Sequence, residues 1–160
     1  MPAKKKTWRE KLADDKDCPK VVEIGPAQSK RWGAGTCVIP APREVDELMR
    51  RVPRGKLTTI DQIRNVLARR HGATICCPMA TGIFAWIAAH AAAESEAAKQ
   101  ARITPFWRTL KARGELNPKY PGGIPLLKRK ITAEGHTVKQ VGKRFFVKGF
   151  EERLATIADR

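Results

Sequence analysis

The spacing of apolar and polar positions predicts two helices between residues 44 and 70. In the first, over residues 44–51, apolar side chains recur at the helical spacing i, i+3, i+4 and i+7, at positions Val45, Leu48, Met49 and Val52. The second begins after Thr59, because Thr59 and Gln62 have the spacing of a capping box. Gly72 is the expected left-handed stop just beyond its end at Arg70.

A third helix is predicted over residues 78–93, because Pro78 suits the first turn of a helix. We expect this helix to bury Ile83, Phe84 and Ile87. Two helices joined by a short glycine-containing turn, with basic flanks, are typical of a helix-turn-helix. The same pattern also suits a plain helical hairpin in a protein core, and both interpretations stay open on pattern alone.

The first 40 residues predict an arm or a small strand layer laid on the main domain. A short helix is expected within residues 4–16, and strands at residues 21–24 and 36–39, separated by a loop at residues 25–35. Residues 151–160 are expected to form a C-terminal tail.

The stretch 104–123 joins two helical segments and does not have the composition of a core. It contains three prolines, three glycines and three aromatic residues among several basic ones. Prolines and glycines fix backbone turns, and aromatic rings beside cations offer stacking faces next to phosphate-seeking charge. We therefore expect a rigid loop that meets a nucleic acid.

A basic amphipathic helix over residues 124–134 and a hairpin complete the pattern. Residues 137–141 and 144–148 are strand-like and flank Gly142 and Lys143, which form a turn. After a helix-turn-helix, a basic hairpin of this kind is expected to act as a wing that contacts the DNA backbone. The chain is thus predicted to be mainly α with a small β component.

The distribution of charge along the chain indicates what kind of partner the protein binds. The net charge of +16 is concentrated in two windows, since residues 50–70 hold seven basic residues against one acidic, and residues 102–148 hold twelve against two. The rest of the chain is neutral. Such concentration favours an anionic partner, with nucleic acid first and an anionic membrane surface second.

The cysteines indicate neither a metal site nor a secreted protein. The four of them, Cys18, Cys37, Cys76 and Cys77, form no Cys-x-x-Cys pair and have no histidine at ligand spacing. The amino-terminal residues lack an apolar run, and the apolar segment 75–93 is interrupted by Pro78 and Gly82. We expect a cytoplasmic, nucleoid-associated monomer with no cofactor and no membrane contact.

Between residues 44 and 135 the motifs resemble the DNA-binding domain of the O6-alkylguanine–DNA alkyltransferases and of their non-catalytic relatives, the alkyltransferase-like proteins. The family motif Pro-Cys-His-Arg is followed by Tyr-x-Gly-Gly and then by a helix that ends in Glu-Gly. The matching residues here are Pro105, Phe106, Trp107, Arg108, Tyr120, Gly122, Gly123, Glu134 and Gly135. The resemblance implies a winged helix-turn-helix domain over residues 41–150.

The chain departs from the family where the chemistry lies. Phe106 stands at the nucleophilic cysteine and Trp107 at the activating histidine. Neither replacement can act as nucleophile or base, because phenyl has no lone pair and the indole N–H only donates. Ile60 stands at the family's phosphate-crowding tyrosine, and Met79 lies near its arginine finger. An apolar wedge such as Met79 still inserts between bases.

The resemblance therefore implies a non-enzymatic protein that binds double-stranded DNA, either sensing alkylated guanine or binding duplexes generally, with DNA-repair proteins as further partners. The predicted DNA-contacting residues are Thr59, Arg64, Arg69, Arg70, Met79, Thr81, Arg108, Lys143 and Arg144. The predicted remnant of the active-site pocket comprises Pro105, Phe106, Trp107, Tyr120, Gly122, Gly123 and Glu134. Glu134, with no histidine to orient, is expected to be structural, and the pocket to be filled by aromatic side chains.

Two alternatives remain open at this point. Cys76 and Cys77 precede a helix N-terminus, where a thiolate is favoured, so they would serve a thiol-dependent alkyltransferase. Charge alone does not separate DNA from RNA, so an RNA-binding protein is the other alternative.

Overall fold

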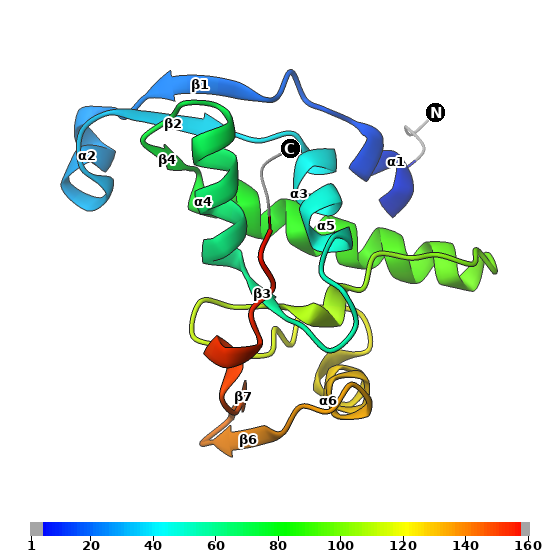
Figure 1. The fold of residues 1–160 in the computed structure, drawn as a ribbon. Helices are drawn as coiled ribbons and strands as arrows, with labels where there is room; N and C mark the ends of the chain where they lie inside the picture. Colours follow the sequence, from blue (N-terminus) through cyan, green and yellow to red (C-terminus); the bar gives the residue numbers. More distant parts are fainter. Residues whose placement is uncertain (1–4, 158–160) are drawn as a thin grey trace.

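The computed structural model describes residues 5–157, in which six α-helices carry most of the regular structure (Figure 1). The helices are α1 (Trp8–Ala13), α2 (Pro26–Trp32), α3 (Pro42–Arg50), α4 (Ile60–Arg70), α5 (Pro78–Ala97) and α6 (Gly123–Ala133). The strands are β1 (Lys20–Glu23), β2 (Thr36–Ile39), β3 (Thr58–Thr59), β4 (Ile75–Cys76), β5 (Thr109–Leu110), β6 (Val138–Val141) and β7 (Arg144–Val147). Two short 3-10 helices, η1 (Phe106–Arg108) and η2 (Phe150–Arg153), complete the order. Residues 1–4 of the expected arm and 158–160 of the expected tail lie outside the described residues.

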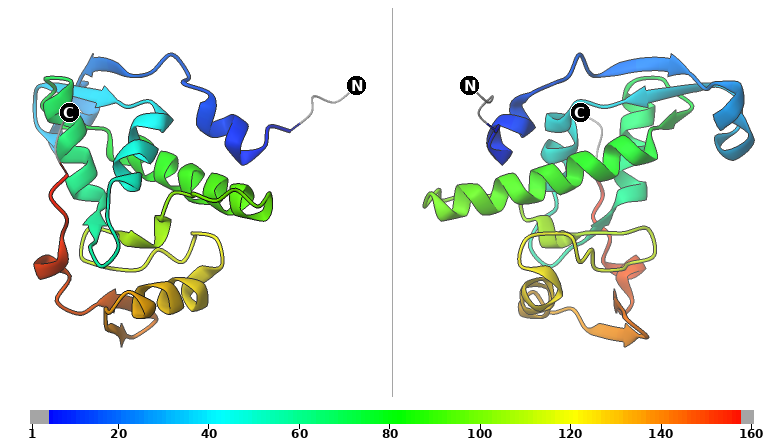
Figure 2. Two further views of the ribbon diagram at one scale, coloured as in Figure 1. Left: turned by 45° about the vertical axis from the view of Figure 1, so that its right-hand side comes forward. Right: turned by 180° about the vertical axis from the view of Figure 1, so that it is seen from behind.

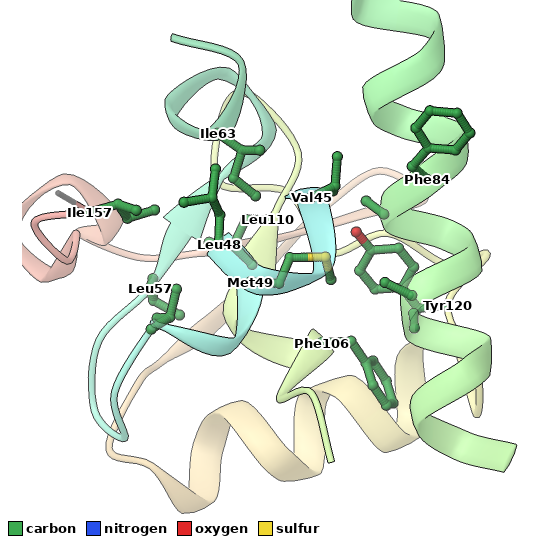
Figure 3. Close-up of a cluster of buried hydrophobic side chains, with 14 of the residues drawn as sticks. Val45, Leu48, Met49, Leu57, Ile63, Phe84, Phe106, Leu110, Tyr120 and Ile157 are labelled. Atoms are coloured by element: carbon green, nitrogen blue, oxygen red, sulfur yellow. The ribbon is translucent and has the colours of Figure 1, made fainter. Parts of the chain in front are cut away.

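Helices α3, α4 and α5 pack around one core, as the apolar spacing predicts. Their buried side chains surround Leu48 and Met49, and Figure 3 shows these with Phe84, Phe106 and Tyr120 from the later segments. Because the core draws on residues from 38 to 157, the central helices and the loop 104–123 form one packed unit. Within residues 5–157 no helix is long and apolar enough to cross a bilayer.

Local signals start and stop these helices. Thr59 caps α4 by accepting a hydrogen bond from the backbone N–H of Gln62 at 3.2 Å. The other half of the expected capping box does not form, because the Gln62 side chain donates instead to the carbonyl of Ala155 at 2.7 Å. After α4, Gly72 adopts the left-handed conformation predicted for it, with φ of 63°.

Helix α5 is longer than expected, and one residue expected to be buried in it is exposed. It runs to Ala97, because the alanine-rich segment after residue 93 continues the helix. Phe84 and Ile87 are buried as predicted, but Ile83 is 47% exposed, so the expectation of a buried Ile83 is wrong. The helical period places Ile83 on the face opposite the core.

The amino-terminal extension forms a strand layer with helices attached. Strands β1, β2 and β4 make a three-stranded sheet in that order, with β1 antiparallel and β4 parallel to β2. The segment expected to be a loop at residues 25–35 contains α2, which starts at a proline after Gly25. Helix α1 lies against α5 near its middle and far half (Figure 1).

The second half of the chain wraps the other side of the core. Strand β5 pairs in parallel with β3, which joins the loop 104–123 to the start of α4. Helix α6 buries Leu127 and Ile131, and the antiparallel hairpin β6–β7 follows it with Gly142 and Lys143 at the turn. Figure 1 shows α6 and the hairpin on the opposite side of α5 from the extension.

Residues 151–157 are part of the fold, whereas the sequence predicts a tail over residues 151–160. The backbone of Leu57 accepts from the N–H of Ala155 at 2.8 Å and donates to the carbonyl of Arg153 at 2.9 Å. Ala155 and Ile157 are each only 7% exposed and belong to the core. Ala155 and Ile157 are buried because the backbone of this segment pairs with Leu57, the residue just before β3.

We predict that Ile157→Ala lowers the free energy of unfolding by about 2 kcal/mol or more, because it empties part of a packed core. Urea denaturation of both proteins measures the difference. Glu151→Ala, at an exposed position of η2, is the matched control and should change stability by less than about 0.5 kcal/mol. Equal stability of wild type and Ile157→Ala would show a dangling tail.

Candidate nucleic-acid interface

The start of α5 is held by bonds from its own first turn and from the extension. The Cys77 Sγ accepts from the N–H of Ala80 at 3.5 Å, and the Thr81 hydroxyl donates to the Cys77 carbonyl at 2.8 Å. The N–H of Cys77 donates to the carbonyl of Val38 at 2.9 Å, which continues the β2–β4 pairing. The first turn of α5 is therefore fixed in place, with its outer face exposed.

An apolar ridge runs along that outer face. Met79 is 70% exposed and Ile83 47%, and Trp86 and His90 continue the row at helical spacing. This ridge forms one wall of a groove of about 760 Å³. The opposite wall comes from the loop 104–123 and consists of Lys111, Asn117, Pro118 and Lys119. The groove thus has an apolar wall on one side and two lysines on the other.

Aromatic rings close the far end of the groove. Trp8 of α1 stacks on His90 with 4.4 Å between ring centroids and packs edge-to-face on Trp86 at 4.8 Å. His90 Nε2 lies 3.2 Å from the carbonyl oxygen of Lys119, which ties the two walls together. Glu94 accepts from the backbone N–H of Trp8 at 3.1 Å and so holds α1 in this position.

Two aromatic residues of the predicted pocket remnant are buried against each other, while Pro105, Trp107 and Arg108 line a hollow of about 500 Å³. Phe106 and Tyr120 are each 3% exposed, and their rings meet edge-to-face at 6.0 Å between centroids. Burial raises the pKa of the Tyr120 hydroxyl far above its ordinary value. The phenyl ring of Phe106 thus lies in the interior beside Tyr120.

Trp107 and Arg108 both bind Glu134, at the end of α6. The indole Nε1 of Trp107 donates to Glu134 Oε2 at 2.8 Å, and the Arg108 guanidinium donates to both carboxylate oxygens at 2.9 Å. Arg108 also donates to the carbonyl of Val52 at 2.8 Å. The Glu134 side chain is 4% exposed, so this carboxylate is a structural anchor, as predicted.

Electrostatics keep that anchor ionised. Burial alone raises the pKa of Glu134, but hydrogen bonds from Arg108 and Trp107 and the charge of Arg108 outweigh it, so the pKa lies below its ordinary value. The ionised form therefore stabilises the fold above the ordinary carboxyl pKa. This contribution is lost as the pH falls through the lowered pKa of the folded state.

Four of the residues predicted to contact DNA are turned inward or bound by other side chains. Thr59 is 6% exposed as the cap of α4, and Thr81 is fully buried. Arg70 pairs with Glu44 at 3.3 Å, and Arg108 is bound to Glu134. These four expectations are corrected, because capping and ion pairing within the fold engage the groups that DNA would need.

The remaining predicted contacts lie on the surface in three places. Met79 lies on the ridge of α5, and Arg69 is exposed near the end of α4. Arg64 lies in the first half of α4 and pairs with Asp61. Lys143 is exposed on the hairpin turn, and Arg144 beside it pairs with Glu115 at 3.1 Å. Of the loop glycines, Gly122 is left-handed with φ of 80° and caps α6. Arg64, Arg69, Met79, Lys143 and Arg144 stay predictions as DNA contacts.

Several groove residues were missed from the sequence. The sequence analysis predicts a buried Ile83, and it singles out neither Trp86 and His90 on the helix nor Lys111 and Lys119 in the loop. The signal for the ridge was present, because positions 79, 83, 86 and 90 recur at helical spacing and so share one face of the helix. The loop wall had no such signal, since it depends on tertiary packing.

The cysteines do not form a reactive pair. Cys76 is 3% exposed, and burial raises the pKa of its thiol to about 11, so it is protonated at neutral pH. Cys37, which lies beside it in the sheet, has a pKa raised to about 11 by burial as well. Among residues 5–157, no three histidine, cysteine, aspartate or glutamate side chains gather in a way that would hold a metal ion.

Comparison with known proteins places the fold. No protein-family model matches the chain, and no curated protein matches it. Among solved structures, the fold is similar to that of the alkyltransferase-like proteins. The matching structure is S. pombe Atl1 in complex with damaged DNA containing O6-carboxymethylguanine, with a TM-score of 0.51 and 18% sequence identity over 72% of this chain and 94% of that chain. The resemblance seen in the sequence motifs is thereby confirmed at the level of the fold.

We predict that Glu134→Gln lowers the free energy of unfolding by about 3–5 kcal/mol at neutral pH, because it leaves the mostly buried Arg108 guanidinium without its counter-charge. Denaturant unfolding of both proteins from pH 7 to pH 3 measures this.

The difference between the two proteins should shrink as the pH falls below about 4.5, the ordinary value for this carboxyl group. Protonation then makes the wild-type side chain neutral as well. A difference that stays constant across this range would show that the pKa of Glu134 is the same in the folded and the unfolded protein. The control is Glu151→Gln, because Glu151 is exposed and makes no ion pair in the described part of the chain.

Proposed function

We propose that this protein binds double-stranded DNA through the outer face of α5 and the groove beside it, without performing a reaction. The single observation that carries the proposal is the groove itself, with the exposed apolar ridge of Met79 and Ile83 facing Lys111 and Lys119. Apolar side chains of this kind wedge between base steps from the minor groove, and lysines on the opposite wall neutralise phosphates.

The fold supports an alkylated base as the preferred target. The S. pombe Atl1 structure of similar fold contains DNA with O6-carboxymethylguanine. A groove of about 760 Å³ falls within the usual range of ligand sites and is roomy enough for a nucleobase turned out of its duplex. Trp86 and His90 offer rings on which such a base would stack.

The residues at the family's active-site positions argue against alkyl transfer. A transferase of this kind needs a thiolate activated by a base, and Phe106 and Trp107 stand where the family has both. Glu134 is engaged by the Trp107 indole and by Arg108 rather than by a histidine. The thiol alternative at Cys76 is disfavoured by its burial and raised pKa. We therefore propose a binding protein and not an enzyme.

The hairpin β6–β7 supplies the wing of the proposed winged helix-turn-helix. Lys143 at its turn is exposed, and Lys139 and Lys148 add charge on its strands and just after them. Arg69, near the end of α4, is a further phosphate contact in this proposal. Together they would bind the backbone on either side of the bases that α5 reaches.

We predict salt-sensitive binding to duplex DNA, with tighter binding when the duplex contains O6-methylguanine. If about four phosphates are neutralised, a rise from 50 to 200 mM salt weakens binding about a hundredfold. Fluorescence anisotropy with matched 20-base-pair duplexes, carrying guanine or O6-methylguanine at one position, measures both effects.

Each result has a separate meaning. Affinity that does not change with salt would contradict the phosphate contacts. Equal affinity for both duplexes would leave a general duplex binder. Competition by structured RNA at least as strong as by duplex DNA would favour the RNA alternative. Transfer of labelled methyl from the lesion to the protein would contradict the absence of a reaction.

We predict that Ile83→Glu weakens duplex binding about tenfold or more, because it places a negative charge on the apolar ridge against the DNA. Ile83 is exposed, so thermal unfolding should be nearly unchanged. Ala97→Glu makes the same charge change at an exposed position of the same helix, fourteen residues further on, and should bind as wild type does. Equal weakening in both variants would argue against the ridge.

A further inference from the structure

Helix α2 is a basic, exposed element that neither the core nor the groove uses. Its seven residues contain Lys30 and Arg31 in the last turn and no acidic residue. Both cations are exposed, and neither forms an ion pair within the part of the chain that the structure describes. The nearest acidic residue along the chain, Glu23 of β1, is exposed and makes no ion pair there either. The extension over residues 1–40 holds nine basic and five acidic residues, and its acidic residues all precede α2.

The sheet ties strand β2, which follows α2, to the segment that starts α5. Strand β2 pairs with β4 through Cys37 and Val38. Beyond the pairing, Thr36 and Thr74 exchange two hydrogen bonds, each from a backbone N–H to the other's hydroxyl, at 3.0 and 3.2 Å.

The connection from α2 to β2 fits closely against Thr74. A Cβ on Gly35 would lie 2.3 Å from the Thr74 Oγ1, and Gly35 has a φ of 131° that favours glycine. Only a glycine allows this close approach. The end of α2 is therefore placed by the turn between α4 and α5 and does not hang free of the molecule.

A small recess makes α2 continuous with the proposed interface. It has a volume of about 230 Å³ and is lined by Trp32, Arg64, Asn65, Thr74, Ile75, Cys76 and Pro78. Pro78 also lines the large groove, so the two hollows adjoin at the first residue of α5. Figures 1 and 2 place α2 at the end of the molecule where α5 begins, beside α4 and β4.

We propose that α2 is a second DNA-contacting element, which binds the phosphate backbone of the same duplex to one side of α5 through Lys30 and Arg31. The inference rests on the proposed function and extends it to the amino-terminal layer. Two unpaired cations next to the recognition surface favour a polyanion. A protein partner is disfavoured, because α2 has only Ala27 and Trp32 as apolar side chains besides its first proline, and a stable protein interface needs a larger apolar centre.

The test is the salt dependence of duplex binding by Lys30→Ala/Arg31→Ala. Each lost phosphate contact reduces the slope of log affinity against log salt by about 0.9, so the double variant should lose about 1.8 from the wild-type slope. Its affinity should therefore fall most at low salt. Thermal unfolding should be unchanged, because both side chains are exposed.

The matched control is Lys99→Gly/Arg102→Ala, which removes the same charge at the far end of α5. Helix α5 has 20 residues and is about 30 Å long, so these positions lie well away from α2. Glycine suits position 99, where φ is 62°. The control should keep the wild-type slope.

The outcomes separate the two proposals. Wild-type binding that lacks salt dependence or fails altogether overturns the proposed function, and this inference with it. Wild-type binding with an unchanged slope in Lys30→Ala/Arg31→Ala overturns this inference alone. An equal loss of slope in the control also overturns it, because net charge and not position would then be responsible. Loss confined to the α2 variant supports it.

Discussion

The carboxylate of Glu134 is the interaction on which the loop 104–123 depends. It is buried at the end of α6 and accepts hydrogen bonds from Trp107 and Arg108, while Arg108 reaches the carbonyl of Val52 after α3. One charge thus joins three segments that are far apart in the sequence. A carboxylate in such a place is costly unless its oxygens are fully bonded, and here the guanidinium and the indole bond them. The loop is held by polar contacts where most loops of its length are loose.

The bonds to Glu134 also determine where the rest of the loop 104–123 lies. With Trp107 and Arg108 turned toward Glu134, the residues that follow them pass under α5 and place Lys111 and Lys119 across from the ridge of Met79 and Ile83. The wall of the groove therefore follows directly in the chain from residues held by a buried ion pair. Since α1 closes the far end through Trp8, the groove draws on the beginning, middle and second half of the chain.

Much of the fold was predictable from local signals, and little of the groove was. Three local signals act within a few residues each, and short sequence motifs therefore predict them. They are capping by Thr59, the left-handed Gly72 and the proline in the first turn of α5. Helix α2 was missed because its seven residues have no apolar periodicity and lie between glycines. The packing of Ile157 and the pairing of Lys119 with His90 depend on distant parts of the chain, which no window of sequence contains.

The parallel pairing of β2 with β4 has a consequence for where the molecule can be divided. Strand β4 has only two residues, and β2 is its one neighbour in the described sheet. A fragment that began near residue 41, at the apparent border of the helical domain, would leave the peptide groups of the turn before α5 exposed or unbonded. The pairing of β2 with β4 thus ties the extension to the start of α5, the helix whose outer face is exposed.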